Sequence, residues 1–142
     1  MDKIEGSDWV STRLRVRYAE TDQMGVAYYA HYLTWFEVAR GELCRVRNVD
    51  YAAMEMQHGL FLPIVYAACR YHSPARYDDL ITISVQVSQL RRRSLQCRYR
   101  VTCETRLLAE GETHQVVVDK DGRPRSFPAD IALKLANRYE TE

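Results

Sequence analysis

An acidic side chain stands just ahead of a helix-like segment near the beginning of the chain. Asp22 lies in a polar stretch that contains Gly25, and apolar residues with helical spacing follow it. The first N–H groups of a helix have no intrahelical partner and carry partial positive charge, so they can stabilise an oxyanion. A carboxylate beside them can attack a carbonyl carbon or deprotonate an attacking water. The pattern fits acyl transfer, and it also fits Asp22 as a cap of the turn.

Other kinds of catalytic or cofactor site lack their sequence patterns. His58, His72 and His114 stand singly, and the four cysteines show no metal-ligand spacing, so no metal site is expected. The chain contains no nucleophile elbow, no glycine-rich dinucleotide motif and no phosphate-binding loop. A serine hydrolase, a nucleotide-dependent enzyme and a resident cofactor are therefore not predicted.

A strand before Asp22 and a long helix after it would position this carboxylate. Residues 12–18 alternate as a strand with one apolar face, and residues 30–47 follow a loop as an amphipathic helix. Arg40 and Arg47 are expected off the apolar line of that helix. Gly41 weakens the helix interior, which indicates a close neighbour at that point.

The rest of the chain is predicted to form a short helix, several strands and a last helix. Residues 51–57 form the short helix, with Asp50 as its N-cap and Gly59 at its end. The later elements are strands at 64–71, 80–90, 95–103 and 107–119, and a helix at 128–139. Short turns join the strands as antiparallel neighbours, and the long helix covers one face. We therefore predict one α+β domain over residues 1–142, an antiparallel β-sheet wrapped around one long central α-helix.

Several motifs occur together and in a fixed order. They are Glu20-Thr21-Asp22-x-x-Gly25-Val26-x-Tyr28-Tyr29-x-x-Tyr32-x-x-Trp35-x-Glu37-x-x-Arg40, then Pro63-Ile64-Val65, Tyr71-x-x-Pro74-Ala75-Arg76-Tyr77-Asp78-Asp79 and Arg91-Arg92-Arg93-Ser94. Together they resemble the hot-dog-fold thioesterases of the 4-hydroxybenzoyl-CoA thioesterase family, including the acyl-CoA thioesterase branch associated with the Tol–Pal system. The resemblance covers residues 11–128 and implies a hot-dog domain that hydrolyses acyl-CoA.

This resemblance implies a role for each matching residue. Asp22 matches the catalytic aspartate, as nucleophile or general base. The backbone N–H of Tyr29 matches the oxyanion donor, and Gly25 lets the loop backbone approach the substrate. The arginines of the 91–93 turn, Arg91, Arg92 and Arg93, match a basic turn that meets the phosphates of coenzyme A.

Side chains near these positions are expected to touch the substrate. Tyr28 and Trp35, from the aromatic run, are predicted to line an acyl pocket, and its opposite wall is predicted to be Leu60, Phe61, Leu62 and Pro63. Pro63, Ile64 and Val65 are also predicted to bind the substrate.

Two positions depart from the pattern of the Tol–Pal branch. That branch usually has His at Tyr29, and the family often has Asn at His31, but a backbone donor at Tyr29 is unaffected. His31 can assist the leaving thiolate or hydrogen-bond locally. Glu37 can act as a second base or as an ion-pair partner of Arg40.

Composition limits the class of partner. The 142 residues include 20 basic and 19 acidic ones, a balance that argues against a nucleic-acid binder. All basic residues except Lys3, Lys120 and Lys134 are arginine, which hints at anion recognition. No apolar run approaches the roughly 20 residues of a membrane helix. The cysteine spacing, without a signal peptide, predicts a reduced, cytoplasmic protein.

The function predicted from these observations is hydrolysis of acyl-CoA to a free acid and coenzyme A. The resemblance implies a homodimer whose sheets join edge to edge and whose sites use both subunits, with a homotetramer as the expected assembly. Two alternatives stay open: a non-catalytic module that binds an acyl thioester or acyl carrier protein, and a hydratase or dehydratase. The acyl group is not predicted.

Overall fold

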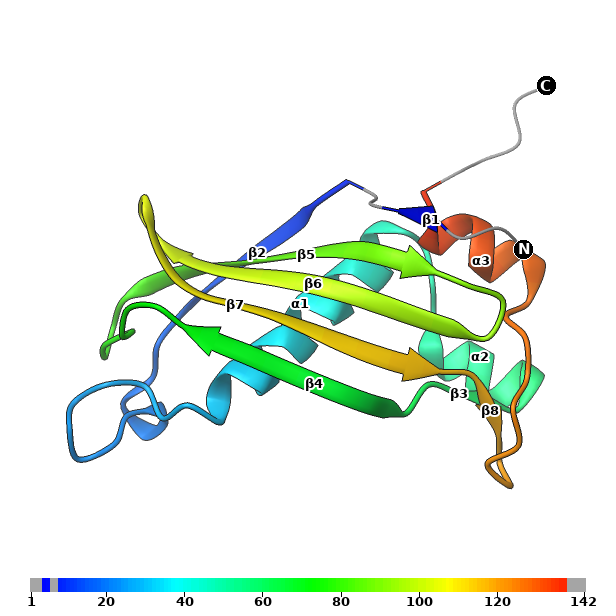
Figure 1. Cartoon of the computed structure of the whole chain (residues 1–142), viewed down its shortest axis with the longest axis horizontal. Coiled ribbons are helices and arrows are strands. Elements are labelled where there is room, and N and C mark those ends of the chain that lie inside the picture. Colours follow the sequence, from blue (N-terminus) through cyan, green and yellow to red (C-terminus); the bar gives the residue numbers. More distant parts are fainter. Residues whose placement is uncertain (1–3, 6–7, 138–142) are drawn as a thin grey trace.

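The largest element of the fold is an antiparallel β-sheet. The computed structural model describes residues 4–5 and 8–137. Its long strands are β4 (Ile64–Tyr71), β5 (Leu80–Leu90), β6 (Ser94–Cys103) and β7 (Arg106–Val116), with the shorter β1 (Ile4–Glu5) and β2 (Val10–Arg15). All pair antiparallel, in the order β1, β5, β6, β7 and β4, and β2 also pairs with β5 (Figure 1). Strand β4 is therefore at one edge of the sheet.

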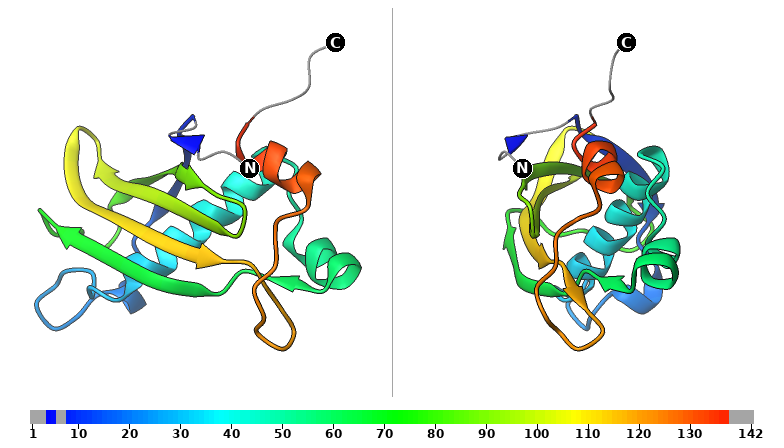
Figure 2. Two further views of the ribbon diagram at one scale, coloured as in Figure 1. Left: turned by 45° about the vertical axis from the view of Figure 1, so that its right-hand side comes forward. Right: turned by 90° about the vertical axis from the view of Figure 1, so that its right-hand side faces the viewer.

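The long helix α1 (His31–Val46) lies across the sheet, which curves around it (Figure 2). Its buried residues recur at spacings of three and four, so one face of the helix is apolar. Alternate residues of β5 and β6 are buried against it, among them Ile83, Val85, Tyr99 and Val101. The predicted α+β arrangement is confirmed.

Two shorter helices both lie at the end of the sheet opposite the Asp22 loop (Figure 1). Helix α2 (Tyr51–His58) begins at Asp50, whose Oδ1 accepts a hydrogen bond from the Ala53 N–H at 3.2 Å, and ends at Gly59 with a left-handed φ of 62°. Both predicted caps are confirmed. Helix α3 (Ala129–Leu135) ends before the predicted boundary, and residues 138 and 139 of the predicted helix lie outside the described residues. None of the helices in the described part of the chain is both long and apolar enough to span a bilayer.

Two predicted strand boundaries were wrong. The first strand ends at Arg15, and a 3₁₀ turn, η1 (Tyr18–Glu20), follows it. The last long strand breaks at Val117, whose N–H donates to the Arg93 carbonyl at 2.9 Å. The chain then leaves the main sheet, and β8 (Val118–Asp119) pairs instead with β3 (Leu60–Phe61).

Two arginines do not face solvent: Arg40 within α1, and Arg47 at its C-cap. The Arg40 guanidinium donates to the Tyr99 hydroxyl at 3.0 Å, and it forms no ion pair with Glu37. Arg47 is 2% exposed and donates to the backbone carbonyls of Leu135 and Asp8, each at 3.0 Å. A buried guanidinium is tolerated where its N–H groups find acceptors. The expectation for these two residues was therefore wrong.

Close approach between helix and sheet occurs at Gly111 rather than at Gly41. A Cβ built on Gly111 would lie 2.4 Å from a ring carbon of Phe36 and 2.7 Å from the Ala68 carbonyl oxygen. At Gly41 the nearest atom is 3.8 Å away, on the flexible Arg45 side chain. The Phe36 ring lies over Gly111 and stacks on Tyr99 at 4.3 Å between ring centroids. Only the strand glycine is required for packing.

We expect Gly111→Ala to destabilise the fold by about 1–3 kcal/mol, because the added methyl group overlaps backbone as well as Phe36. Gly41→Ala is the matched control and should stabilise the helix by up to about 1 kcal/mol. Urea unfolding followed by circular dichroism measures both. Equal stability of Gly111→Ala and the wild type would contradict the close approach.

Candidate active site

The loop that carries Asp22 is held by backbone hydrogen bonds. The Asp22 N–H donates to the Val26 carbonyl at 2.9 Å, and Thr21 and Ala27 form an antiparallel bridge. The Ala27 N–H donates to the Ala75 carbonyl at 2.8 Å, which ties the loop to the segment before β5. The position of Asp22 is therefore fixed by the fold.

The Asp22 carboxylate caps its own turn with one oxygen. Its Oδ1 accepts from the Met24 N–H at 2.8 Å, and its carbonyl accepts from Gly25 at 3.0 Å. Gly25 has a φ of 79°, a conformation that favours glycine. Within the described chain, Oδ2 accepts no hydrogen bond. Asp22 can therefore cap the turn with Oδ1 and act on a substrate with Oδ2.

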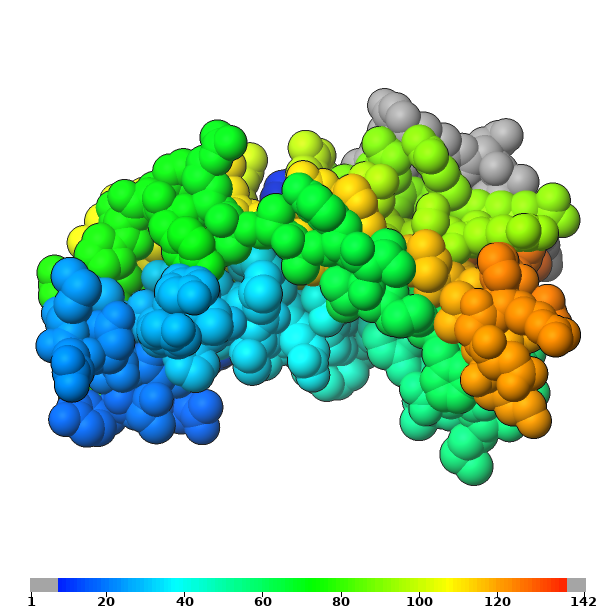
Figure 3. All heavy atoms as spheres, turned by 60° about the horizontal axis from the view of Figure 1, so that its bottom comes forward, coloured from blue at the N-terminus to red at the C-terminus, as the bar shows by residue number. Residues whose placement is uncertain are grey.

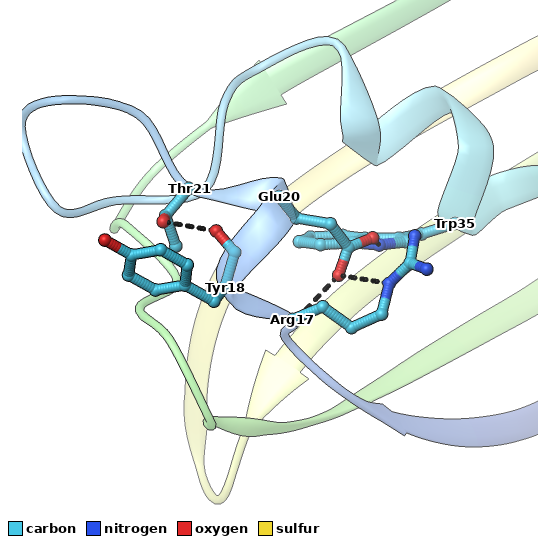
Figure 4. Close-up of polar contacts among 5 residues, drawn as sticks. All are labelled: Arg17, Tyr18, Glu20, Thr21 and Trp35. Carbon is cyan, nitrogen blue, oxygen red and sulfur yellow. Dashed lines mark hydrogen bonds and ion pairs between the residues drawn. The ribbon is translucent and has the colours of Figure 1, made fainter.

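Glu20 joins the turn, the loop and the helix at one buried carboxylate. Its Oε1 accepts from the Arg17 N–H at 2.8 Å, and its Oε2 accepts from the Trp35 indole N–H at 2.9 Å (Figure 4). The Arg17 side chain also lies 3.5 Å from Oε1. The Glu20 carbonyl accepts from the Tyr28 N–H at 2.8 Å. Both ends of the 21–27 loop therefore depend on Glu20.

The pKa of Glu20 lies below its usual value. Burial acts to raise the pKa, but hydrogen bonds from the Arg17 N–H and the Trp35 indole, and the Arg17 charge, outweigh that effect. The carboxylate form is thus the one that the fold stabilises.

The head of α1 presents two free backbone N–H groups. The Tyr28 carbonyl accepts from the His31 N–H at 3.0 Å, and the Tyr29 carbonyl accepts from the Tyr71 hydroxyl at 2.8 Å. In a trans peptide the N–H points opposite to the carbonyl, so the N–H groups of Tyr29 and Ala30 point away from the helix. Neither donates to any described residue. This is the geometry that an oxyanion site needs.

A hollow of about 250 Å³ lies beside this helix head. It is lined by Val26, Ala27, Tyr29, Tyr32, Tyr71, His72, Ser73 and Pro74. Tyr71, His72 and Ser73 were not among the predicted site residues. Their place at the start of the family-like segment from Tyr71 to Asp79 was the available signal, but only the fold brings that segment to Tyr29.

The other residues predicted near Asp22 have different surroundings. His31 begins α1, and its ring lies edge-on to Tyr28 at 6.1 Å. Tyr28 is 43% exposed, and its pKa is raised chiefly by a hydrogen bond with the Tyr29 hydroxyl. Trp35 is 1% exposed, so it belongs to the core, and its indole N–H is used by Glu20. Their roles at a substrate stay predictions.

The remaining predicted substrate residues lie at the opposite end of the sheet. Leu80, at the start of β5, pairs with Arg15 close to the Asp22 loop, whereas Leu90, at its end, leads into the 91–93 turn. Eleven residues of strand span about 35 Å. Pro63, Ile64 and Val65 are likewise at the far end of β4 from Tyr71. Figures 1 and 3 show the Asp22 loop in blue at one end and the 118–127 segment in orange at the other. One chain alone does not bring these groups together.

No three His, Cys, Asp or Glu side chains of the described residues come close enough to hold a metal ion.

Comparison with known proteins identifies the family. Residues 16–135 match the model of the Thioesterase-like superfamily. The chain belongs to this family. The hot-dog thioesterase resemblance carried by the motifs is thereby confirmed, as is the hot-dog fold.

Individual curated relatives and solved structures are similar to this chain over most of their length. The acyl-CoA thioester hydrolase YbgC of Escherichia coli is 34% identical over 124 residues, which cover 86% of this chain and 92% of that protein. A hypothetical protein from Thermus thermophilus has 35% identity and a TM-score of 0.84, covering 91% of this chain and 98% of that one. A DHNA-CoA thioesterase from Staphylococcus aureus has 31% identity and a TM-score of 0.79, covering 83% of this chain and 80% of that one.

Glu20→Gln should lower the free energy of unfolding at pH 7 by about 1–3 kcal/mol, because a buried charge-assisted acceptor is replaced by an amide. Since the folded pKa is lowered, the stabilisation by the carboxylate is full above the unfolded pKa of about 4.3 and is lost as pH falls through the folded value. The difference between variant and wild type should therefore shrink below that pH. Urea unfolding from pH 7 to 3 measures it.

The control is Glu37→Gln, because Glu37 is an exposed acid on α1 with no partner among the residues described. The free energy of unfolding of Glu37→Gln should match that of the wild type from pH 7 to 3. A Glu20→Gln curve parallel to the wild type over the whole pH range would show that these hydrogen bonds do not stabilise the fold.

Proposed function

We propose that the protein hydrolyses acyl-CoA thioesters with Asp22 and the backbone N–H of Tyr29. The observation that carries the proposal is the free N–H pair at the head of α1 beside the loop that bears Asp22. Membership of the thioesterase family and the similarity to an acyl-CoA thioester hydrolase support the reaction and the substrate class.

The chemistry needs an acceptor for the carbonyl charge and a group that delivers water. The thioester oxygen would accept from the Tyr29 N–H, where the negative charge of the tetrahedral intermediate develops. As general base, Asp22 takes a proton from water while the hydroxide adds to the carbonyl carbon, and the proton then leaves with the coenzyme A sulfur. As nucleophile, Asp22 displaces the thiolate and forms an anhydride that water then hydrolyses. Oδ2 is available for either route.

A second copy of the chain would complete the site. Strand β4 is an edge strand with Ile64, Val65 and Tyr66 41%, 60% and 48% exposed, and exposed edges favour pairing. If two β4 edges pair antiparallel about a twofold axis through the middle of the strand, residue 64 of one copy lies near residue 71 of the other. Pro63, Ile64 and Val65 of the second copy would then wall the hollow, and its 91–93 turn would approach the substrate. A homodimer is therefore the proposed unit, and two dimers the proposed tetramer.

The proposed location is a reducing compartment such as the cytoplasm. All four cysteines are unpaired, including Cys97 and Cys103, which lie apart along β6. Free thiols are typical of such compartments.

Asp22→Asn should lower kcat for thiol release from acyl-CoA by at least about 100-fold, because an amide neither attacks nor takes a proton. Asp78→Asn is the control: this exposed acid is at the same end of the sheet and has a φ of 68°, which Asn tolerates. A thiol reagent with a panel of aliphatic and aromatic acyl-CoAs measures release. Wild-type turnover by Asp22→Asn would refute the mechanism, and binding without release of any acyl-CoA by the native protein would favour a binding module.

Replacing Arg91, Arg92 and Arg93 together by Ala should raise KM for acyl-CoA more than it lowers kcat, because phosphates remote from the carbonyl contribute uniform binding. The KM for acyl-carrier-protein thioesters, which present a single phosphate, should rise less than the KM for acyl-CoA. An unchanged KM would remove this turn from the substrate site.

Mixing the two impaired variants tests the shared site. When Asp22→Asn chains and triple-alanine chains exchange subunits, each mixed dimer holds one site with an intact Asp22 from one chain and intact arginines from the other. At low substrate, a 1:1 mixture should regain about a quarter of wild-type activity. Activity no higher than the mean of the separate variants would show that each site uses one chain only.

A further inference from the structure

We propose that Tyr71 is a positioning residue for this reaction, which holds the head of α1 so that the Tyr29 N–H stays aimed at the oxyanion. The inference rests on the proposed function. The Tyr71 hydroxyl, at the end of β4, donates to the Tyr29 carbonyl at 2.8 Å. The two residues are 42 positions apart and both line the hollow beside the helix head.

The first turn of α1 needs an external anchor because its own capping is weak. Its N-cap residue is Ala30, whose side chain offers no hydrogen bond to the free N–H groups. The next two backbone bonds after that of the His31 N–H are long, at 3.4 Å from Tyr32 N to the Tyr29 carbonyl and 3.3 Å from Leu33 N to the Ala30 carbonyl. The bond from Tyr71 is the short one at this position, so it fixes the Tyr29 carbonyl.

Fixing that carbonyl also fixes the neighbouring N–H groups. The Tyr29 carbonyl and the Ala30 N–H belong to one planar peptide, so a rotation that frees the carbonyl redirects the N–H. The same rotation alters the ψ angle of Tyr29 and loosens the peptide that carries the Tyr29 N–H. Oxyanion donors stabilise a transition state only when they are already oriented. The Tyr71 hydroxyl would therefore act on the reaction rate without touching the substrate.

The surroundings keep the Tyr71 side chain in place and its hydroxyl protonated. Its ring packs edge-on against Tyr32 at 4.9 Å and against Tyr29 at 6.5 Å. Burial, and then a hydrogen bond with the Cys69 thiol, raise the pKa of Tyr71 well above its usual value. The hydroxyl is thus a donor at any pH at which the enzyme would work.

Tyr71→Phe is the direct test, because it keeps the ring contacts and removes only the hydroxyl. We expect kcat to fall about 10-fold, less than the 100-fold or more seen when an oxyanion donor itself is removed, with KM within about twofold of the wild type. Tyr77→Phe is the matched control: this exposed tyrosine stacks edge-on with Tyr18, and its hydroxyl bonds to no described residue. Its kinetics should not change.

A pair of inhibitors separates positioning from a general structural effect. An acyl-CoA analogue whose ketone forms a tetrahedral oxyanion should bind Tyr71→Phe more weakly by about the same factor as the loss in kcat, whereas an alkyl-CoA thioether without a carbonyl should bind unchanged. A kcat within twofold of the wild type would overturn the proposal, and so would equal weakening of both analogues. Failure of the proposed function itself would appear separately, as activity in Asp22→Asn.

Discussion

The buried carboxylate of Glu20 is the constraint on which the arrangement of this molecule depends. It is almost fully buried, yet it is charged, because the Arg17 N–H and the Trp35 indole satisfy its two oxygens. These partners belong to the 3₁₀ turn and to the core face of α1, and the Glu20 carbonyl accepts from Tyr28 at the other end of the loop. A polar group buried in this way is costly unless all its partners are present, so the turn, loop and helix must form together. Asp22 is two residues away.

Close packing against the sheet also fixes helix α1. Phe36 lies on Gly111 and stacks against Tyr99, and the Tyr99 hydroxyl bonds to both Arg40 and Thr113. The middle of α1 is therefore fixed by contacts with the sheet, and Tyr32 in its first turn is buried as well, whereas the N–H groups of Tyr29 and Ala30 have no described partner. These two N–H groups are available to a substrate, and the orientation of the helix head depends on Glu20 and Tyr71.

Much of the fold could be predicted from local patterns. Strict alternation located the strands, because one face is buried, and Asp50 and Gly59 marked the ends of α2 through well-understood capping chemistry. The burial of Arg40 and Arg47 could not be predicted, since long side chains reach acceptors that sequence spacing does not reveal. The link from Tyr71 to Tyr29 is also non-local. The motifs indicated residues that match one family site but not that they lie at opposite ends of the sheet in one chain.

The separation of the two ends of the sheet bears on how such a protein changes over evolutionary time. In the proposed dimer, the groups that perform the chemistry come from the 20–29 segment, and the wall that meets the acyl group comes from residues 63–65 of another copy. Substitutions in the wall can alter which acids are accepted without disturbing Glu20 or the helix head. Selection for a new substrate and selection for catalytic efficiency would then act on different elements of one short gene product.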